Sequence, residues 1–379
     1  MRDAGGWARA REVFGVFLRL GGTAFGGPAA HIAMMHHELV RRRRWVTEEE
    51  FLDLLSATYL IPGPNSTEMA IHLGRVRAGG LGLVLGGLAF IAPAAGIVTA
   101  LAALYVRFRT APTLEGLLYG VKPVVLALIL QALWDLGRRA LSRPFAWALG
   151  ATVTLLYLLG VHELLLLFAT GAAMVLARRG PRPRRAAGLG LLPLLPLAHP
   201  PAPFRLGEMF LIFLKIGATL YGSGYVLVAF LRADFVARRG WLTEGQLLDA
   251  VAIGQVTPGP VLTTATFIGY LLAGLPGALL ATVGIFLLSF VFVAVTGPLI
   301  PRLRRSPDAA AFLDGVNIAS LGLMAGVVIA LARAALVDPW TVALGLAALV
   351  ALARFRINAT WPVLAGAAIG ALRILLAAR

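Results

Sequence analysis

Apolar segments long enough to cross a membrane alternate with short polar stretches along most of this chain. A membrane-spanning helix needs about 20 mostly apolar residues, with a usual range of about 17–25. A membrane β-barrel would instead show apolar and polar residues in strict alternation. The pattern therefore predicts an all-α polytopic membrane protein. The predicted apolar segments are residues 80–106, 112–136, 144–160, 161–177, 276–300, 312–332, 339–353 and 357–376.

The pattern occurs twice, with the second copy 196 residues after the first, so that Phe17 aligns with Phe213. Over residues 17–64, 17 of 48 positions are identical to those of residues 213–260, and no gap is needed. Such duplication is typical of transporters built from internal repeats, which are commonly inverted. We therefore expect two inverted repeats, residues 1–177 and 206–379, each with two broken or re-entrant helical segments and about four spanning helices.

The segment between the repeats, residues 178–205, is rich in proline and opens with five arginines in eight positions. Basic segments next to membrane helices are retained on the cytoplasmic side. We expect this linker to be cytoplasmic.

Two short helices separated by a break are predicted in residues 45–77. Thr47 and Glu50 form a capping box, so a helix begins at about residue 48. It ends before Pro62, and a second helix begins at Pro64 with Asn65 as its N-cap. Each piece holds about 13 residues, about 20 Å at 1.5 Å per residue, which is too short to span a bilayer. Interrupted backbone at that depth is tolerated only where it is buried in protein or lines a wet cavity.

The same break recurs in the second copy and in the first segment of each repeat. The four breaks are at residues 26–28, 62–65, 222–225 and 258–261. One Pro-Gly-Pro alone would be explained as a turn between packed helices, but four breaks at paired positions favour a site. Helix starts expose free N–H donors and a partial positive charge, and so bind anions. The predicted substrate-binding residues are Gly26, Gly27, Pro28, His31, Pro62, Gly63, Pro64, Asn65, Ser66, Thr67, Gly222, Ser223, Gly224, Tyr225, Pro258, Gly259, Pro260, Thr263 and Thr264.

Three charged residues near the breaks are candidates for coupling or for charge compensation. Glu68 lies one turn past the first break and is either a proton-coupling carboxylate or the capping partner of Asn65. Lys122 begins an apolar span, where a buried lysine would be functional, although its amine could also reach the surface. Arg75 follows the second half-helix and is better explained as a loop charge.

Composition excludes several other classes of function. The net charge is +16, and nearly all of it is arginine at segment ends, where it suits anionic lipid or an anion path. No soluble domain is large enough to bind nucleic acid. The chain has no cysteine, so disulfides and thiolate chemistry are excluded. No nucleotide-binding or catalytic motif is present, and we expect no enzyme activity, no cofactor and no bound metal.

The motifs resemble the chromate transporter family in its long-chain, two-domain form. The resemblance rests on Phe25-Gly26-Gly27-Pro28 with His31, on Trp45 to Phe51, on Pro62 to Asn65, and on their second-half counterparts Gly222 to Tyr225, Trp241 to Thr243 and Thr257 to Pro260. It covers both repeats. It implies an inner-membrane secondary transporter that exports chromate and confers chromate resistance, with sulfate as a chemical mimic. The second half departs from the first at Gly224 and Val261, so the two half-sites are not equivalent.

Other functions stay open at this point. An anion channel, or a carrier for sulfate or another oxyanion, would use the same breaks. An enzyme acting on a lipid phosphate would also use helix N-termini, but the sequence lacks an acid–base or metal cluster. The expected partners are the oxyanion and the lipid bilayer, and a homodimer is left open.

Overall fold

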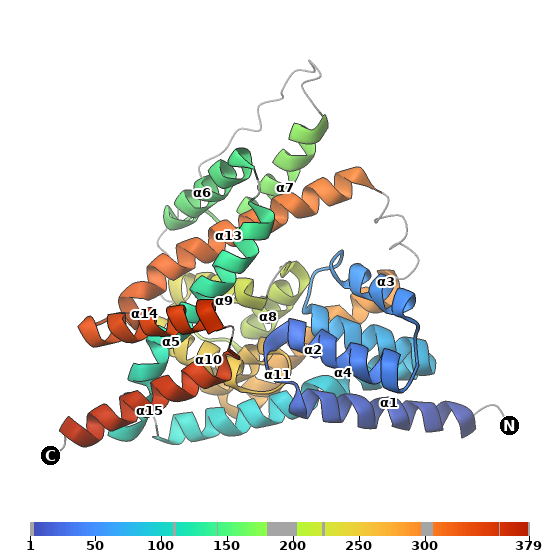
Figure 1. The fold of residues 1–379 in the computed structure, drawn as a ribbon, viewed down its shortest axis with the longest axis horizontal. Coiled ribbons are helices and arrows are strands. Elements are labelled where there is room, and N and C mark those ends of the chain that lie inside the picture. The colour runs from blue at the N-terminus through green and yellow to red at the C-terminus, as the bar shows by residue number, and fades with distance from the viewer. Residues whose placement is uncertain are drawn as a thin grey trace.

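The computed structural model describes residues 4–108, 111–141, 143–179, 203–221, 224–296, 306–355 and 357–377. Within them every regular element is a helix, and two sets of helices follow one another in the same order (Figure 1). The first helix and the last helix lie at opposite ends of the long axis (Figure 1). The expected linker falls almost entirely outside the described residues.

The first repeat contains seven α-helices and one π-helical turn. They are α1 (Ala4–Thr23), α2 (Gly27–His36), η1 (His37–Arg42), α3 (Glu48–Thr58), α4 (Asn65–Phe108), α5 (Pro112–Ala140), α6 (Pro144–Leu158) and α7 (Glu163–Arg179). The second repeat has the same order, with 3₁₀ turns at its two breaks. Its elements are α8 (Leu206–Thr219), η2 (Gly224–Val226), α9 (Leu227–Leu231), η3 (Arg232–Arg238), α10 (Glu244–Val256), η4 (Val261–Thr263), α11 (Thr264–Thr296), α13 (Pro307–Ala335), α14 (Pro339–Phe355) and α15 (Thr360–Ala377).

Local sequence explains where the broken segments start and stop. Thr47 caps α3 and Thr243 caps α10, each in a complete capping box, as predicted. After each Pro-Gly-Pro a helix resumes and then kinks. The kinks lie at Gly79 in α4 and Gly274 in α11, whose φ values are 62° and 61°. Each of these long elements is therefore a short helix followed by a long one.

Four of the described helices are long and apolar enough to cross a membrane. They are Asn65–Phe108, Leu114–Arg138, Val261–Thr296 and Pro307–Ala335. They form two equivalent pairs, one in each repeat, and α5 and α13 run in opposite directions (Figure 1). The protein is an all-α membrane protein of two repeats, and its antiparallel α5 and α13 are the geometry expected of inversion.

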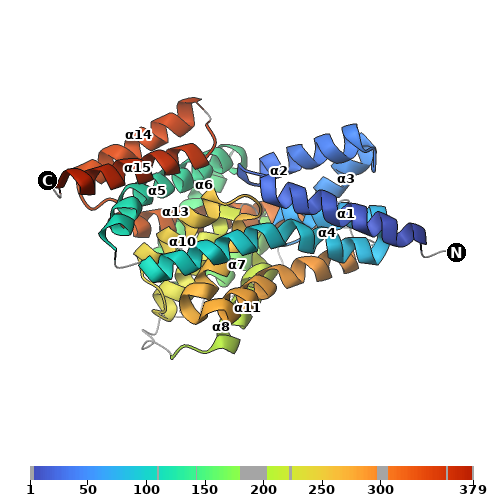
Figure 2. The same ribbon diagram turned by 90° about the horizontal axis from the view of Figure 1, so that it is seen from below.

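The repeats exchange their last two helices. Helix α7 packs against α13 of the other repeat, while α15 packs against α5. Glycines allow this close approach: a Cβ at Gly120 would lie 1.9 Å from the carbonyl oxygen of Gly366, and one at Gly315 would lie 2.7 Å from Cα of Gly171. Helices α6 and α14 follow the same rule against α13 and α5. Figure 2 shows α14 and α15 beside α5.

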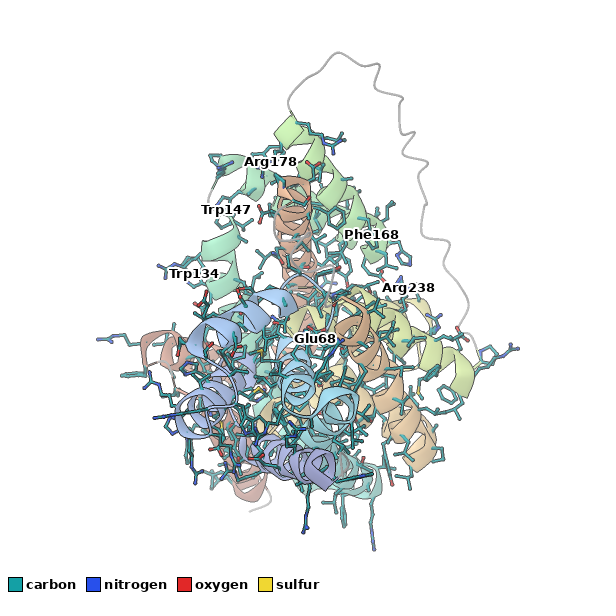
Figure 3. All side chains as sticks on the ribbon, turned by 90° about the vertical axis from the view of Figure 1, so that its right-hand side faces the viewer. Glu68, Trp134, Trp147, Phe168, Arg178 and Arg238 are labelled. Atoms are coloured by element: carbon teal, nitrogen blue, oxygen red, sulfur yellow. The ribbon has the colours of Figure 1, made fainter. Side chains whose placement is uncertain are left out.

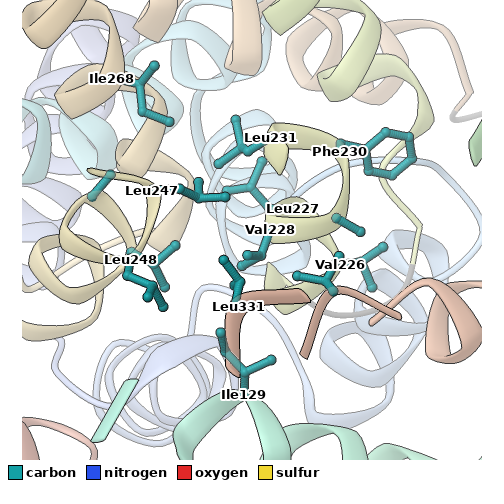
Figure 4. Packing of buried hydrophobic residues seen from close by; sticks show 14 of the residues in the cluster. Ile129, Val226, Leu227, Val228, Phe230, Leu231, Leu247, Leu248, Ile268 and Leu331 are labelled. Atoms are coloured by element: carbon teal, nitrogen blue, oxygen red, sulfur yellow. The ribbon is translucent and has the colours of Figure 1, made fainter. Parts of the chain in front are cut away.

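The largest apolar core surrounds the broken segments of the second repeat (Figure 4). Leu227 and Leu231 of α9 meet Leu247 of α10 and are fully buried. Ile129 of α5 and Leu331 of α13 close the cluster from the two long antiparallel helices. The breaks are thus held between α5 and α13.

Charged residues of the first two segments pair within each repeat. Nη2 of Arg19 lies 2.7 Å from Oε1 of Glu38. Nζ of the equivalent Lys215 lies 2.5 Å from Oδ2 of Asp234. These pairs fix the angle between a helix and the segment that follows its break, so much of the arginine excess near these segments is structural.

Candidate functional site

The four helix breaks meet in two pairs, and each pair joins the two repeats. The N–H of Gly63, in the second break of the first repeat, donates to the carbonyl of Leu220 at 2.8 Å. The N–H of Gly259 donates to the carbonyl of Ala24 at 2.9 Å. The sequence predicts four breaks, and these bonds bring every break of one repeat to a break of the other.

A cavity of about 310 Å³ lies where three of the breaks meet. At about 30 Å³ of liquid volume per water, it can hold a small anion together with several waters. Its wall includes six of the predicted site residues: Gly26, Gly27, Pro28, Gly224, Tyr225 and Gly259. The remaining wall comes from α5 and α10, through Leu128, Gln131, Ala132, Asp135, Gly254, Gln255 and Thr257, with Ala29, Val261 and Ala359.

Gln255, in the wall of this cavity, carries a hydrogen-bond donor that has no partner. Its Nε2 is buried and has no hydrogen-bond partner, while its Oε1 lies 3.4 Å from the hydroxyl of Tyr225. A buried amide N–H that lacks a partner costs about 1–3 kcal/mol, so a ligand that accepts this hydrogen bond would be favoured. The amide of Gln131 differs, because it donates to the carbonyl of Leu352 at 3.4 Å.

Two helical segments begin at the same cavity. Helix α2 begins at Gly27, and its N-cap Gly26 has a φ of 106°. The turn η4 begins at Val261 and leads into α11. Free N–H groups at the start of a helix favour anions. Together with the Gln255 amide, these N–H groups supply hydrogen-bond donors for an anion without the full charge of an arginine. Such a site suits an anion that must be released again.

The other break of the first repeat is closed rather than open to this cavity. Pro62, Gly63 and Pro64 are buried, as are Ser66 and Thr67 behind them. Helix α4 begins at Asn65 itself, and the amide of Glu68 bonds to the carbonyl of Pro64 at 3.0 Å. Asn65 is therefore the first helical residue and not the predicted N-cap.

Glu68 lies in the interior beside that closed break (Figure 3). Its side chain is fully buried, and neither carboxyl oxygen has a hydrogen-bond partner. A Cβ placed on Gly63 would lie 2.1 Å from Oε1 of Glu68 and 2.8 Å from Oγ of Ser289. The Ser289 hydroxyl is also buried without a partner. Glu68 and Ser289, one from each repeat, thus both lie close to Gly63. At the equivalent place beside Gly259 the structure has Ala94.

The remaining predicted residues serve the packing of the breaks. His31 is buried, and its Nε2 lies 3.1 Å from the carbonyl of Ala24. The hydroxyls of Thr263 and Thr264 donate to the carbonyls of Pro260 and Val261. Pro258 is buried beside them, and Gly222 and Ser223 lie outside the described residues.

The two other candidate charges join the repeats. Nζ of Lys122 lies 3.6 Å from the carboxylate of Asp249, which accepts a hydrogen bond from Tyr105 at 2.9 Å. Arg75 donates to the carbonyls of Val293 and Ala294 at 2.7 and 3.1 Å. Neither contributes to the cavity wall, so both are explained by contacts between α4, α5, α10 and α11.

Sequence reasoning missed the polar residues that α5 and α10 contribute to the cavity. Gln255 was detectable as an amide within an apolar helix, three residues before Pro258. The α5 contribution depends on how the repeats pack, which the sequence does not reveal. Among the described residues, no group of three His, Cys, Asp or Glu side chains is placed to hold a metal ion.

A second and wider cavity, of about 730 Å³, lies between the C-terminal end of α5 and the N-terminal end of α13. Tyr59, at the end of α3, and Val226 of η2 form part of its wall. The ends of α6 and α7 complete it and contribute Arg143 and Arg178. This cavity therefore opens at the end of the molecule where the basic segment that begins with Arg178 leaves α7.

Comparison with known proteins gives the same duplication. The family model described as "Chromate transporter" matches residues 11–176 and again residues 207–371. A "Probable chromate transport protein" of Synechococcus elongatus is 35% identical over 345 residues, which is 88% of this chain and 87% of that protein. The "Chromate transport protein" of Cupriavidus metallidurans is 33% identical, over 95% of this chain and 92% of its own. The "Chromate transport protein" of Pseudomonas aeruginosa is 34% identical, over 85% of this chain and 81% of its own. No solved structure matches the chain.

Proposed function

The chain belongs to the chromate transporter family, and from this premise we propose that it is a secondary transporter that exports chromate across the inner membrane. In this proposal residues 1–177 and 206–379 are the two transport repeats, and residues 178–205 join them on the cytoplasmic side. The cargo is a small tetrahedral dianion. Its removal from the cytoplasm would confer resistance to chromate.

The cavity at the three breaks is the proposed binding site. The observation that carries this proposal is the unpartnered Nε2 of Gln255 beside the hydroxyl of Tyr225, within a cavity that also receives the start of α2. The Gln255 amide and the first N–H groups of α2 are neutral donors at this cavity, and the Tyr225 hydroxyl donates to Oε1 of Gln255. A tetrahedral oxyanion accepts hydrogen bonds in several directions at once, so it matches such a set better than a cation would.

Alternating access is the proposed mode of transport, and export its direction. The wide cavity opens at the arginine-rich end, which the positive-inside rule places in the cytoplasm. Tyr59 and Val226 bring that cavity close to the breaks, so an anion that enters it would approach the proposed site. The two inverted repeats would also provide a conformation that is open at the opposite end. It would form if each repeat adopted the conformation that the other has here.

Glu68 is the proposed coupling residue. An ionised carboxylate that is buried without a partner costs several kcal/mol, and among the described residues no hydrogen bond or ion pair to the Glu68 carboxyl is found. We therefore infer that its carboxyl holds a proton in this conformation. A conformational change that admits water to Ser289 and Glu68 would release that proton, which would link proton movement to anion movement.

The substrate assignment is tested by flux measurements in proteoliposomes. Chromate uptake should be saturable and sulfate should compete. Gln255→Leu should raise the KM for chromate at least about fivefold, because it removes a donor worth about 1–3 kcal/mol. Gln131→Leu is the matched control: this amide also lines the cavity but is bonded to Leu352. Flux that does not saturate and carries single-channel currents would identify an anion channel. An unchanged KM in Gln255→Leu would place the site elsewhere.

Coupling is tested separately, with Glu68→Gln. This variant should lose the acceleration of chromate transport by a pH gradient but keep chromate–chromate exchange, because exchange needs no net proton movement. Glu50→Gln, in the exposed capping box of α3, is the control for losing one carboxylate. A Glu68→Gln protein that still responds to the pH gradient as the unmodified protein does would exclude this role.

A further inference from the structure

Two equivalent sets of three side chains lie at the two ends of the crossed helices α5 and α13. With a shift of 195 residues, Tyr119 corresponds to Asp314, Arg143 to Asp338, and Arg178 to Arg373. The structure supports this correspondence. Helices α5 and α13 have bounds that differ by 195 at both ends, and the glycine contacts of α7 with α13 repeat between α15 and α5 at the same shift.

At one end the three side chains are in contact, and we call them the closed triad (Tyr119, Asp338 and Arg373). The Tyr119 hydroxyl donates to Oδ2 of Asp338 at 2.5 Å, and the Arg373 guanidinium lies 3.5 Å from the same oxygen. Cζ of Arg373 lies 4.1 Å from the centre of the Tyr119 ring. The hydrogen bond from Tyr119, helped by the amide of Thr341, lowers the pKa of Asp338 from its ordinary value. The loop that ends α13 is thereby tied to α5 and α15.

At the other end the corresponding side chains stand apart, and we call them the open triad (Asp314, Arg143 and Arg178). All three are exposed and line the wide cavity. Among the described residues, no ion pair joins Asp314 to Arg143 or to Arg178. Figure 3 shows Arg178 at the outer end of α7, next to α13.

The chemistry of the open triad allows it to close in the same way. It contains a carboxylate on α13, an arginine on α7, which packs on α13, and an arginine that follows α5 as the N-cap of α6. The closed triad likewise combines a carboxylate and an arginine, with a tyrosine hydroxyl as the further donor. If the end of α5 approached α13, Asp314 would accept hydrogen bonds from both arginines, and the wide cavity would shut.

We propose that the two triads are the alternately closing gates of the transporter, worked by a rocking movement of α5 against α13. In such a movement one triad separates as the other comes into contact, because α5 and α13 pack on each other between the two triads. The open triad has a second consequence. Its two arginines face the cavity while it is open and attract an entering anion, and Asp314 replaces the anion as their partner when the gate shuts. This inference rests on the alternating access proposed above.

The test measures which end is open without measuring any transport. The chain has no cysteine, so a single Asn317→Cys in the wall of the wide cavity reports access to a membrane-impermeant maleimide. Asp338→Asn weakens the closed triad, so the population should shift toward the conformation with the wide cavity shut, and labelling should slow at least threefold. Adding Asp314→Asn to Asp338→Asn weakens both gates, and labelling should return to near its starting rate.

The control is Asp308→Asn, which removes an exposed aspartate that pairs with Arg179 at the same end as the wide cavity but outside its wall. This variant should not change labelling. The gates are excluded if Asp338→Asn leaves labelling unchanged, if Asp308→Asn slows it equally, or if Asp314→Asn fails to restore it. Reciprocal labelling in a protein that moves no chromate would refute the substrate while leaving the gates in place.

Discussion

Replacing Gly63 by alanine tests whether the break at Gly63 is crowded by neighbouring side chains or is an ordinary turn. Gly63 has a φ of 139°, and a Cβ there would lie 2.1 Å from Oε1 of Glu68 and 2.8 Å from Oγ of Ser289. Alanine at such a φ costs about 1–3 kcal/mol in backbone strain. Overpacking of a buried site adds about 1–3 kcal/mol. Gly63→Ala should therefore lower the free energy of unfolding by about 2–6 kcal/mol.

Gly79→Ala separates the two contributions. Gly79 also has a positive φ, of 62°, but a Cβ there meets nothing within 4 Å. It should show the strain alone, so the Tm of Gly63→Ala in detergent should fall below that of Gly79→Ala by several degrees. At about 2 °C per kcal/mol for a large domain, the expected difference is about 2–6 °C, measured by tryptophan fluorescence on heating.

A double variant shows whether Glu68 causes the crowding. Glu68→Asp shortens the side chain by one methylene and withdraws the carboxyl from the added methyl group. In the Gly63→Ala background it should recover part of the lost Tm, whereas alone it should be neutral or destabilising. Equal Tm values for Gly63→Ala and Gly79→Ala, or no recovery in the double variant, would refute this description of the closed break.

Two further predictions concern contacts that hold the repeats together and a third concerns a helix cap, and each is measured as a Tm in detergent. Asp249→Asn should cost about 1–3 kcal/mol, less than the about 3–5 kcal/mol of a fully buried pair, because Lys122 is partly exposed; no loss would mean that this ion pair is not formed. Gly120→Ala should force α5 away from Gly366 and destabilise strongly, unlike Gly96→Ala, where a Cβ has open space. Thr243→Ala should cost about 1 kcal/mol by removing the N-cap of α10, and an unchanged Tm would show that the cap is dispensable.

The helix breaks and caps could be predicted because they depend on neighbours in sequence. Proline cannot continue a helix, and a threonine three residues before glutamate or glutamine satisfies the first free amides of one. Both signals act within a few residues, so Thr47 and Thr243 cap the helices that the sequence predicts. The one-residue error at Asn65 has the same local origin, since either Pro64 or Asn65 can precede the first turn.

The arrangement of the breaks could not be predicted, because it depends on contacts between residues far apart in the chain. The hydrogen bond from Gly63 to Leu220 and the approach of Ser289 to Gly63 both join different repeats. The sequence does not show which breaks meet, whereas packing opens three of them to one cavity and closes the fourth. Gln255 acquires its unpartnered donor only from that packing.

The exchange of the last two helices means that neither repeat is a complete folding unit. A single repeat would leave the glycine-lined faces of its own α5 without the helices that cover them, so it could become stable only with a second copy, as a domain-swapped pair. In a pair of identical chains every substitution appears twice, on both sides of the axis. In one continuous chain a substitution appears once, which is how Gln255 can stand in one cavity while its counterpart Tyr59 stands in another. Covalent union of the two halves thus permits a binding site with a single orientation inside a symmetric scaffold.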